Sequence, residues 1–347
     1  MELRNQTPYT AGFFNCVVSR DELLGAVIAR ATFRMEKGSL VLDHQNPFPV
    51  GSEPLKLPEG ELDREVPFLR KGVDLMILGH AYAPNGKPVE SLSMTIKVGE
   101  KFLRRILVIG DRVWEGDINH LKPSRPKPFL KIPLSYQRAY GGKSLGEAGL
   151  MAFPANGEGR GFYLTAEQAL GNPLPNLEDP ENPIQSWKDQ PNPVGTGPYP
   201  ASGSLRLMNS IELTKDPTKE QIKHPSDIKI KRIKPEFFNN AHPSMIIYEP
   251  IQTGDVVEVS HLTPEGPFRF NLPDLSMHAH VQLENRHFLF PSHLESIVIL
   301  GDERRVFFTS RIAFRYRIIP LERRVVTLYQ GPPPSILPDH YVIQWEH

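Results

Sequence analysis

The sequence has little cysteine, no long hydrophobic run and no net charge. Cys16 is the single cysteine among 347 residues, which excludes an internal disulfide and a zinc site built from several cysteines. No apolar run approaches the roughly 18 residues of a membrane helix. The first residues, Met1 to Gln6, also lack the apolar core of a signal peptide. We therefore expect a cytoplasmic protein that does not engage a membrane.

The charges of the chain balance. Lysine and arginine together number 40, as do aspartate and glutamate, so the formal net charge is zero. A nucleic-acid-binding protein usually carries an excess of positive charge on its binding face. The composition therefore predicts that nucleic acid is not a partner, and it suits a carrier that recognises protein by shape and apolar contact.

Proline is the residue in excess, with 35 positions of 347, roughly twice ordinary usage. Thirteen of these prolines lie between Lys122 and Pro200, where long helices and central strands are excluded because proline lacks a backbone donor. Aromatic residues such as Tyr136, Tyr140 and Trp187 are interspersed with them. Disordered segments lack such anchors, so we expect an ordered loop region that is packed down.

The flanking parts of the chain read as short strands. Ser91–Val98 alternates apolar and polar residues with the period of a half-buried strand. Turn residues at 36–38, 110–111 and 301–304 predict hairpins that join strands on either side. Helix is confined to a possible two turns at 165–170 and one turn at 234–239.

These patterns predict a mainly β protein with little helix. We expect a curved antiparallel sheet, sandwich or barrel-like, covered by long proline-rich ordered loops. Three parts are distinguished: a β-rich part at 1–121, a proline-rich, motif-bearing loop region at 122–245 and a β-rich part at 246–347. They are expected to form one compact unit.

Histidines near the C-terminal end offer a candidate metal site. In a strand, His278 and His280 share one face, which suits two imidazole ligands of zinc or iron, with His287, His293 or Glu284 to complete the shell. Twelve histidines in one chain produce clusters by chance, however, and no carboxylate stands at a recognised ligand spacing. We therefore expect no metal and no cofactor.

Glu178 and Asp179 are a second candidate, because paired carboxylates near Trp187 resemble a glycosidase acid and base. Adjacent residues of an extended chain point apart, which favours a turn or a cap instead. The alternative function that remains open is a carbohydrate-active or metal-dependent hydrolase that uses Glu178 or the His278/His280 cluster.

Two basic runs are interpreted as strand faces. The run at 229–234 alternates lysine or arginine with isoleucine, which is typical of an edge strand protected from unwanted pairing. It could equally bind an acidic partner. Arg311, Arg315 and Arg317 are expected on the outward face of another strand, where their long stems cover apolar neighbours.

The segment 127–142, Lys-Pro-Phe-Leu-Lys-Ile-Pro-Leu-Ser-Tyr-Gln-Arg-Ala-Tyr-Gly-Gly, resembles the signature of a bacterial family first catalogued as a domain of unknown function and later linked to type VI secretion. Further segments match the family in the right order, namely 71–74, 79–84, 108–114, 123–124, 172–178, 191–198 and 236–241. The resemblance covers nearly the whole chain.

This resemblance implies a cytoplasmic chaperone or adaptor without enzyme activity, metal or cofactor. Members of the family hold a toxic effector that often carries a PAAR-type tip domain, and they help to mount it on the VgrG spike. The implied partners are therefore an effector with a PAAR-like or N-terminal loading segment and the spike protein VgrG.

Such a role needs exposed apolar surface or an open strand edge. The candidate partner-binding residues are Tyr136, Arg138, Tyr140, Phe237 and Phe238. The alternative, which we favour, is that the aromatic residues anchor the long loops in a core. Gly141 and Gly142 are expected at a position of positive φ or close backbone approach, which a side chain would disrupt.

Overall fold

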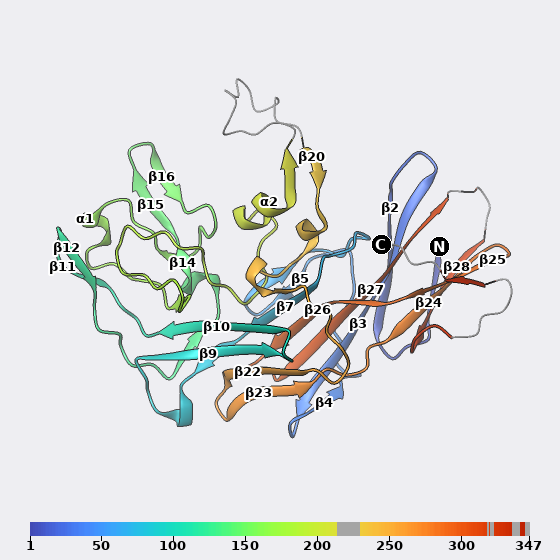
Figure 1. Ribbon diagram of the computed structural model, residues 1–347, viewed down its shortest axis with the longest axis horizontal. Coiled ribbons are helices and arrows are strands. Elements are labelled where there is room, and N and C mark those ends of the chain that lie inside the picture. The colour runs from blue at the N-terminus through green and yellow to red at the C-terminus, as the bar shows by residue number, and fades with distance from the viewer. Residues whose placement is uncertain (214–229, 318, 320–322, 335–340, 344–347) are drawn as a thin grey trace.

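A computed structural model describes residues 1–213, 230–317, 319, 323–334 and 341–343 (Figure 1). Three larger sheets and several two-stranded pairs make up the described chain, and its helices are short. None of these sheets closes on itself in the described ranges. The expected mainly β class with little helix is confirmed, in the form of open, packed sheets. No helix among the described residues is long and apolar enough to span a bilayer.

The central sheet has seven strands, and the other two large sheets pack against it. It runs in the order β2 (Thr10–Val17), β3 (Glu22–Glu36), β27 (Arg305–Arg317), β26 (His293–Leu300), β7 (Val73–Leu78) and β21 (Ile246–Ile247), with β4 (Ser39–Leu42) paired to β3. Its longest pairing joins β3 to β27 from Arg34 opposite Arg305 to Glu22 opposite Arg317.

The other two large sheets have five strands each. One runs β18 (Leu177–Glu178), β10 (Phe102–Ile109), β9 (Ser91–Val98), β22 (Val256–Thr263) and β23 (Gly266–Asn271). The other runs β1 (Glu2–Asn5), β28 (Arg324–Gln330), β24 (Met277–Leu283), β25 (Arg286–Pro291) and β29 (Tyr341–Ile343). Each large sheet thus combines strands that lie far apart in the sequence.

Both five-stranded sheets cover the same face of β27. Phe308 contacts Phe270 of β23 edge to face, and Phe314 stacks on Phe290 of β25 with ring centroids 5.2 Å apart. Successive residues of a strand point to opposite faces, so Phe308 and Phe314 lie on the same face of β27, while the opposite face, which carries Phe307 and Arg311, is also buried. The result is a sandwich-like core with aromatic side chains at its centre.

Local sequence signals explain most of these strands. β9 has the predicted bounds, and its alternate residues Leu92, Met94, Ile96 and Val98 are buried. The turn at 36–38 joins β3 to β4, with Lys37 and Gly38 at positive φ, and the turn at 301–304 joins β26 to β27. Both hairpins are confirmed.

The hairpin predicted at Gly110 and Asp111 is wrong. β10 ends at Ile109 and pairs with β9 and β18, whereas residues 112–114 run beside 172–174. Gly110 does not adopt positive φ, and its amide donates to the carbonyl of Glu90. The chain therefore continues past this position, where the backbone of Lys127 comes too close for any side chain.

Short elements fill the connections. The two-stranded pairs are β5 (Leu55–Leu57) with β6 (Gly60–Leu62), β8 (His80–Tyr82) with β13 (Lys131–Pro133), β11 (Trp114–Asp117) with β12 (His120–Pro123), β14 (Tyr140–Gly141) with β17 (Arg160–Gly161), β15 (Lys143–Gly146) with β16 (Gly149–Ala152), and β19 (Ile211–Leu213) with β20 (Ile230–Ile233). The helices are α1 (Ala166–Ala169), α2 (Ser204–Ser210) and the single 3-10 turns η1 (Pro84–Gly86), η2 (Tyr136–Arg138), η4 (Pro235–Phe238) and η5 (Pro243–Met245).

Several of these short elements were expected. α1 begins after Thr165, whose hydroxyl accepts from the amide of Gln168 as predicted, and η4 is the expected single turn. β20 confirms the edge strand over Ile230–Ile233, while Lys229 lies outside the described residues. α2 was not predicted.

The proline-rich segment is packed down, as expected. The segment, at the left of Figure 1, closes around a small core of buried residues. This core consists of Trp114, Tyr140, Phe162, Ala169, Leu174 and Ile184. Tyr140 and Phe153 meet edge to face with centroids 5.1 Å apart. These ring contacts add to the backbone hydrogen bonds that hold the loops in place.

Arg311 corrects the predicted outward arginine face. Its side chain is fully buried, and it donates to Glu295 at 2.7 Å and to Glu65 at 3.2 Å. Glu65 also accepts from Arg30 at 2.6 Å and from Arg70 at 3.4 Å. Arg315 and Arg317, farther along β27, are exposed as predicted. Glu295 and Glu65 lie far from Arg311 in the sequence. The residues around Arg311 therefore gave no sign that its side chain is buried and paired.

Asp74 completes this buried network on the far face of the central sheet. Burial raises the pKa of Asp74, although Arg70 and the amides of Asn239 and Asn240 oppose the shift. Burial also acts to raise the pKa of Glu65, but its three arginines outweigh that effect and hold it below the ordinary value. A charge balance buried in this way is costly to disturb.

Candidate functional site

A cleft of about 1040 Å³ opens between four loops of the chain. The loops contribute residues 58–63, 133–137, 154–158 and 198–203, and three of them belong to or adjoin the proline-rich segment. Ligand sites are usually concave regions of this size or smaller, roughly 300–1,000 Å³. We therefore take this cleft as the candidate functional site.

Two tyrosines support the walls of the cleft. The rings of Tyr136 and Tyr199 lie 5.6 Å apart at 57°, and Tyr199 donates to the carbonyl of Ala155 at 2.9 Å. Burial raises the pKa of both phenols. A β-carbon at Gly195 would lie 2.2 Å from the ring of Tyr136, so only glycine permits this packing.

The cleft is acidic. Its lining includes Glu59, Glu61, Asp63 and Glu158 but no lysine or arginine. Asp63 pairs with Arg206 at 2.6 Å and Glu158 with Lys143 at 3.2 Å, both cations lying outside the lining. Carboxylates gathered in a concave surface focus negative potential. The arrangement favours a cationic group on whatever enters.

Burial raises the pKa of Glu59, and nearby Asp302 adds to the shift while His80 opposes it. One of its carboxylate oxygens is buried and has no hydrogen-bond partner among the residues that the structure describes. A carboxylate in this state gains from a donor that approaches through the cleft.

One motif frame holds the cleft from the side of the proline-rich segment. Arg138 donates to both Asp111 and Asn176 at 3.1 Å. Asn176 is fully buried and in turn donates to Asp111 and to the carbonyl of Ile109. Segments 108–114, 136–142 and 172–178, which carry the family resemblance, are thus locked to one another.

A second motif frame joins segments 71–74 and 236–241. Lys71 pairs with Glu236 at 2.8 Å, and the side chain of Asn239 bonds to both the amide and the carbonyl of Lys71. Asn239 also donates to Asp74 at 2.8 Å. Asn240 accepts from the amide of Asp63, a residue of the cleft. The frame therefore positions one wall of the site.

His80 and Asp302 form a hydrogen-bonded pair beside the cleft that sequence reasoning missed. His80 Nδ1 lies 2.6 Å from Asp302 Oδ2, and Tyr82 donates to the other carboxylate oxygen at 3.1 Å. Such a pair resembles a base with its orienting carboxylate. Within the described chain, however, no serine, threonine or cysteine bonds to His80. The motif at 79–84 was the available signal, but Asp302 lies 222 residues away.

The candidate partner-binding residues occupy different environments. Tyr136 lines the cleft, and Arg138 belongs to the first motif frame. Tyr140 is 2% exposed, which favours the alternative of a core anchor for this residue. Phe237 and Phe238 are half-buried, and Phe238 stacks on exposed Phe68 with centroids 4.6 Å apart. The structure does not bring all five together on one face.

Gly141 and Gly142 meet the expectation. Their φ angles are 145° and 109°, and a β-carbon at Gly141 would lie 2.0 Å from the carbonyl oxygen of Asn156. Both a positive φ and a close approach therefore exclude side chains here.

The histidine cluster and Glu178 are engaged in other interactions. His278 and His280 do share a strand face, but His278 bonds to the carbonyl of Gly331, and His280 bonds to His287 at 2.9 Å. Across the described ranges no group of three or more histidine, cysteine or acidic residues could hold a metal ion. Glu178 is buried and pairs with Arg112, while Asp179 pairs with Arg104 at 2.9 Å.

An apolar hairpin adjoins the cleft. Leu145 and Leu150 face each other across β15 and β16 and are 65% and 69% exposed. Met151, the next residue of β16, is 48% exposed. The chain continues from β16 directly into the cleft wall at residues 154–158. Exposed apolar side chains that lie together mark interaction sites more often than scattered ones do.

Together these features define a mainly β protein with an acidic, aromatic cleft framed by proline-rich loops. The chain belongs to the bacterial family described as "Uncharacterized protein conserved in bacteria (DUF2169)", whose family model matches residues 20–311. No curated protein and no solved structure matches the chain.

Proposed function

We propose that the protein is a non-enzymatic chaperone or adaptor of the bacterial cytoplasm that holds a polypeptide partner in the acidic cleft. By the family resemblance of its motifs, the partner is a type VI secretion effector with a PAAR-like or N-terminal loading segment, which the protein helps to load onto the VgrG spike. The observation that carries the proposal is the cleft itself, which is large, framed by motif residues and continuous along the chain with an exposed apolar hairpin.

The features of the cleft suit a protein ligand. A loading segment with basic and apolar side chains would place its cations near Glu59 and Glu61 and its apolar residues against Leu145 and Leu150. The two strands of the hairpin pair only with each other in the described structure, so each has an edge that can accept a strand. Loops held by buried side-chain contacts lose little entropy on binding.

The hydrolase alternative has no comparable support. Glu178 is already occupied by Arg112 and by the amide of Ile184. His280 bonds to His287 at 2.9 Å.

The test is binding of the purified protein to its cognate effector and to VgrG, measured by co-elution and calorimetry. We expect a stable complex with micromolar or better affinity. The double charge reversal E61K/E158K should weaken it by about tenfold or more, because like charges would then meet across the interface. The hairpin variant L145S/L150S should weaken it by removing apolar contact.

The matched control is E53K/E115K, which reverses two exposed carboxylates outside the cleft and should leave affinity unchanged. If the wild-type protein binds neither effector nor spike at micromolar concentration, the adaptor proposal fails. If it binds but the cleft, hairpin and control variants behave alike, the assignment of the cleft fails while the adaptor role stands.

A further inference from the structure

The central sheet ends in an edge strand that lacks the usual protection. β2 has eight residues, and among the described strands it pairs with β3 alone. Its sequence, Thr-Ala-Gly-Phe-Phe-Asn-Cys-Val, contains no charged residue and no proline. Natural sheets commonly guard an edge with a short strand, a charge or a proline, because a bare edge is a template for another strand. β2 has none of these features.

The other edges of the large sheets are guarded in these ways. β18 and β21 have two residues each, β29 has three and β4 has four. β23 contains Pro267 and Arg269, and β1 contains Glu2 and Arg4. In the described structure β2 is therefore the large-sheet edge that is both long and uncharged.

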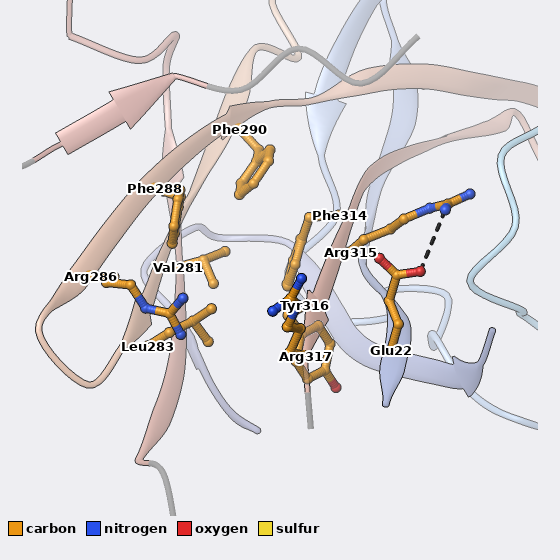
Figure 2. A pocket seen from close by; sticks show the side chains of 10 residues that line it. All are labelled: Glu22, Val281, Leu283, Arg286, Phe288, Phe290, Phe314, Arg315, Tyr316 and Arg317. Carbon is orange, nitrogen blue, oxygen red and sulfur yellow. Dashed lines mark ion pairs between the residues drawn. The ribbon is translucent and has the colours of Figure 1, made fainter. Parts of the chain in front are cut away.

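Charged side chains near this edge lie on the inner strands instead. Figure 2 shows Glu22 at the end of β3 and Arg315 of β27, which form an ion pair with an N–O distance of 3.6 Å. Phe314, also drawn there, stacks on Phe290 across the sandwich, and its ring centroid lies 6.2 Å from that of Phe13 in β2. An aromatic contact thus holds β2 against the core, and no charge lies along its outer edge.

The hydrogen-bonding groups that β2 presents outward belong to every second residue. The amide of Val18 donates to the carbonyl of Glu22 at 3.0 Å, and this pair sets the alternation along the hairpin. Hydrogen-bonded and non-hydrogen-bonded positions alternate in an antiparallel pair, so the even-numbered residues of β2 bond to β3. The odd-numbered residues turn their N–H and C=O groups away from β3, and no backbone group of the described chain bonds to them. They are Ala11, Phe13, Asn15 and Val17.

We infer that β2 pairs with β2 of a second copy of this chain, antiparallel about a two-fold axis, so that the two central sheets become continuous. A strand is the expected occupant, because only another strand satisfies a whole row of backbone donors and acceptors. An axis through Phe14 pairs all the outward residues at once, with Phe13 opposite Asn15 and Ala11 opposite Val17 of the second copy. The uncharged sequence lets two identical strands meet without like-charge repulsion.

This register suits the neighbouring residues. Phe14 of each copy faces Phe14 of the other at a non-hydrogen-bonded position, where Cα atoms lie about 4.5 Å apart, and aromatic pairs across strands stabilise a sheet. Arg20 and Asp21 at the hairpin tip would lie beside residues 7–9 of the second copy, which carry no charge.

The acidic cleft lies outside this interface. None of its lining residues belongs to β2. β2 stands to the right of centre in Figure 1, away from the proline-rich segment at the left. Pairing through β2 therefore uses no residue of the cleft, and each copy keeps its own.

The test is the oligomeric state of the full-length protein, measured by sedimentation equilibrium from about 1 to 100 µM. We expect a monomer–dimer equilibrium with a Kd in the micromolar range or below. N15P should weaken the dimer by about tenfold or more, because it removes an outward N–H from each copy and leaves the even-numbered bonds to β3 intact. N15A, which keeps the N–H, is the matched control and should dimerise as the wild type does.

The variants F14K and F14E test the register. Each alone should weaken the dimer by about tenfold or more, because like charges then stand directly opposite each other. An equimolar mixture of the two should regain the dimer, since opposite charges face each other in the mixed pair. Thermal unfolding of each variant checks that the fold is kept.

A monomer throughout this concentration range would overturn the inference. A dimer that is equally stable in N15P and N15A would also overturn it, as would a failure of the F14K and F14E mixture to regain the dimer. If the protein is monomeric and N15P instead weakens effector binding, the edge of β2 belongs to the effector and the second copy is excluded. Dimerisation is measured without effector or VgrG, so its failure and the failure of the adaptor proposal are distinguishable.

Discussion

The buried charge network beneath the central sheet makes the substitution Glu65→Gln a demanding test of the fold. Glu65 accepts from Arg30, Arg70 and Arg311 at 2.6, 3.4 and 3.2 Å. Glutamine keeps the shape of the glutamate side chain but removes its negative charge. The three arginines are then left with two carboxylates, those of Glu295 and Asp74. Breaking a buried pair by removing one partner costs about 3–5 kcal/mol, so we expect a loss of this size in the free energy of unfolding.

The assay is urea unfolding at pH 7, followed by circular dichroism and fluorescence together to check that the transition is two-state. A second substitution separates charge imbalance from lost packing. In the double variant E65Q/R30M the formal charges balance again, and Arg30 no longer faces glutamine. We expect the double variant to be more stable than the sum of the single effects predicts, by about 1–3 kcal/mol.

The control is Glu100→Gln, which removes a fully exposed carboxylate paired with Lys97 and should leave stability unchanged because surface pairs contribute little. The reasoning is refuted if E65Q unfolds at the wild-type urea concentration. It is also refuted if E65Q and R30M are strictly additive, because the network would then have no energetic coupling.

Two further predictions concern single residues near the cleft. G141A should lower stability by about 1–3 kcal/mol or more, and by more than G149A, because Gly149 has positive φ but open space around it; equal losses in thermal or urea unfolding would show that the approach of Asn156 is unimportant. Burial lowers the pKa of His242 to about 4 from 6.5. Between these pKa values the imidazole is protonated in the unfolded chain but not in the folded protein. Lowering the pH from about 6.5 to 4 therefore reduces the free energy of unfolding by up to about 3 kcal/mol. H242N should flatten that decline in urea unfolding measured from pH 7 to 4; parallel curves would contradict it.

The sequence allowed prediction of features that depend on neighbours along the chain. β9 was predicted residue for residue because its alternation is uninterrupted, and α1 because Thr165 caps it locally. The hairpin at 301–304 followed from its turn residues. Each of these needs contacts within a few residues, which is the range over which pattern and propensity act.

The errors have one physical cause, which is dependence on distant partners. Arg311 looked like a surface residue because Glu65 lies 246 positions away. Gly110 and Asp111 are residue types that favour a tight turn. The backbone of Lys127, however, packs against Gly110 and donates to the carbonyl of Asp111, where a returning strand would have to lie. Tertiary contacts of this kind override local preference.

The cleft was beyond sequence prediction for the same reason. Its walls come from four loops, and the loop at 58–63 carries no family motif. Tyr136 was singled out as a partner-binding candidate through the motif that contains it, and it does line the cleft. The carboxylates Glu59, Glu61 and Glu158 gave no signal, because nothing in their local sequence indicates that they share a concavity.

Motif residues and cleft residues have different roles, and this difference bears on which partner the protein binds. Motif residues such as Asp111, Asn176 and Asn239 bond to one another within the frames, so most of their polar atoms are occupied before any partner arrives. Glu61, Glu158 and the hairpin leucines lie outside the matching segments and have exposed side chains. If the adaptor proposal holds, proteins that share the frames will share the cleft, while the residues that distinguish one partner from another will be those outside the motifs. Exchange of these exposed positions between two relatives, with the frames untouched, should therefore transfer partner choice without a loss of stability.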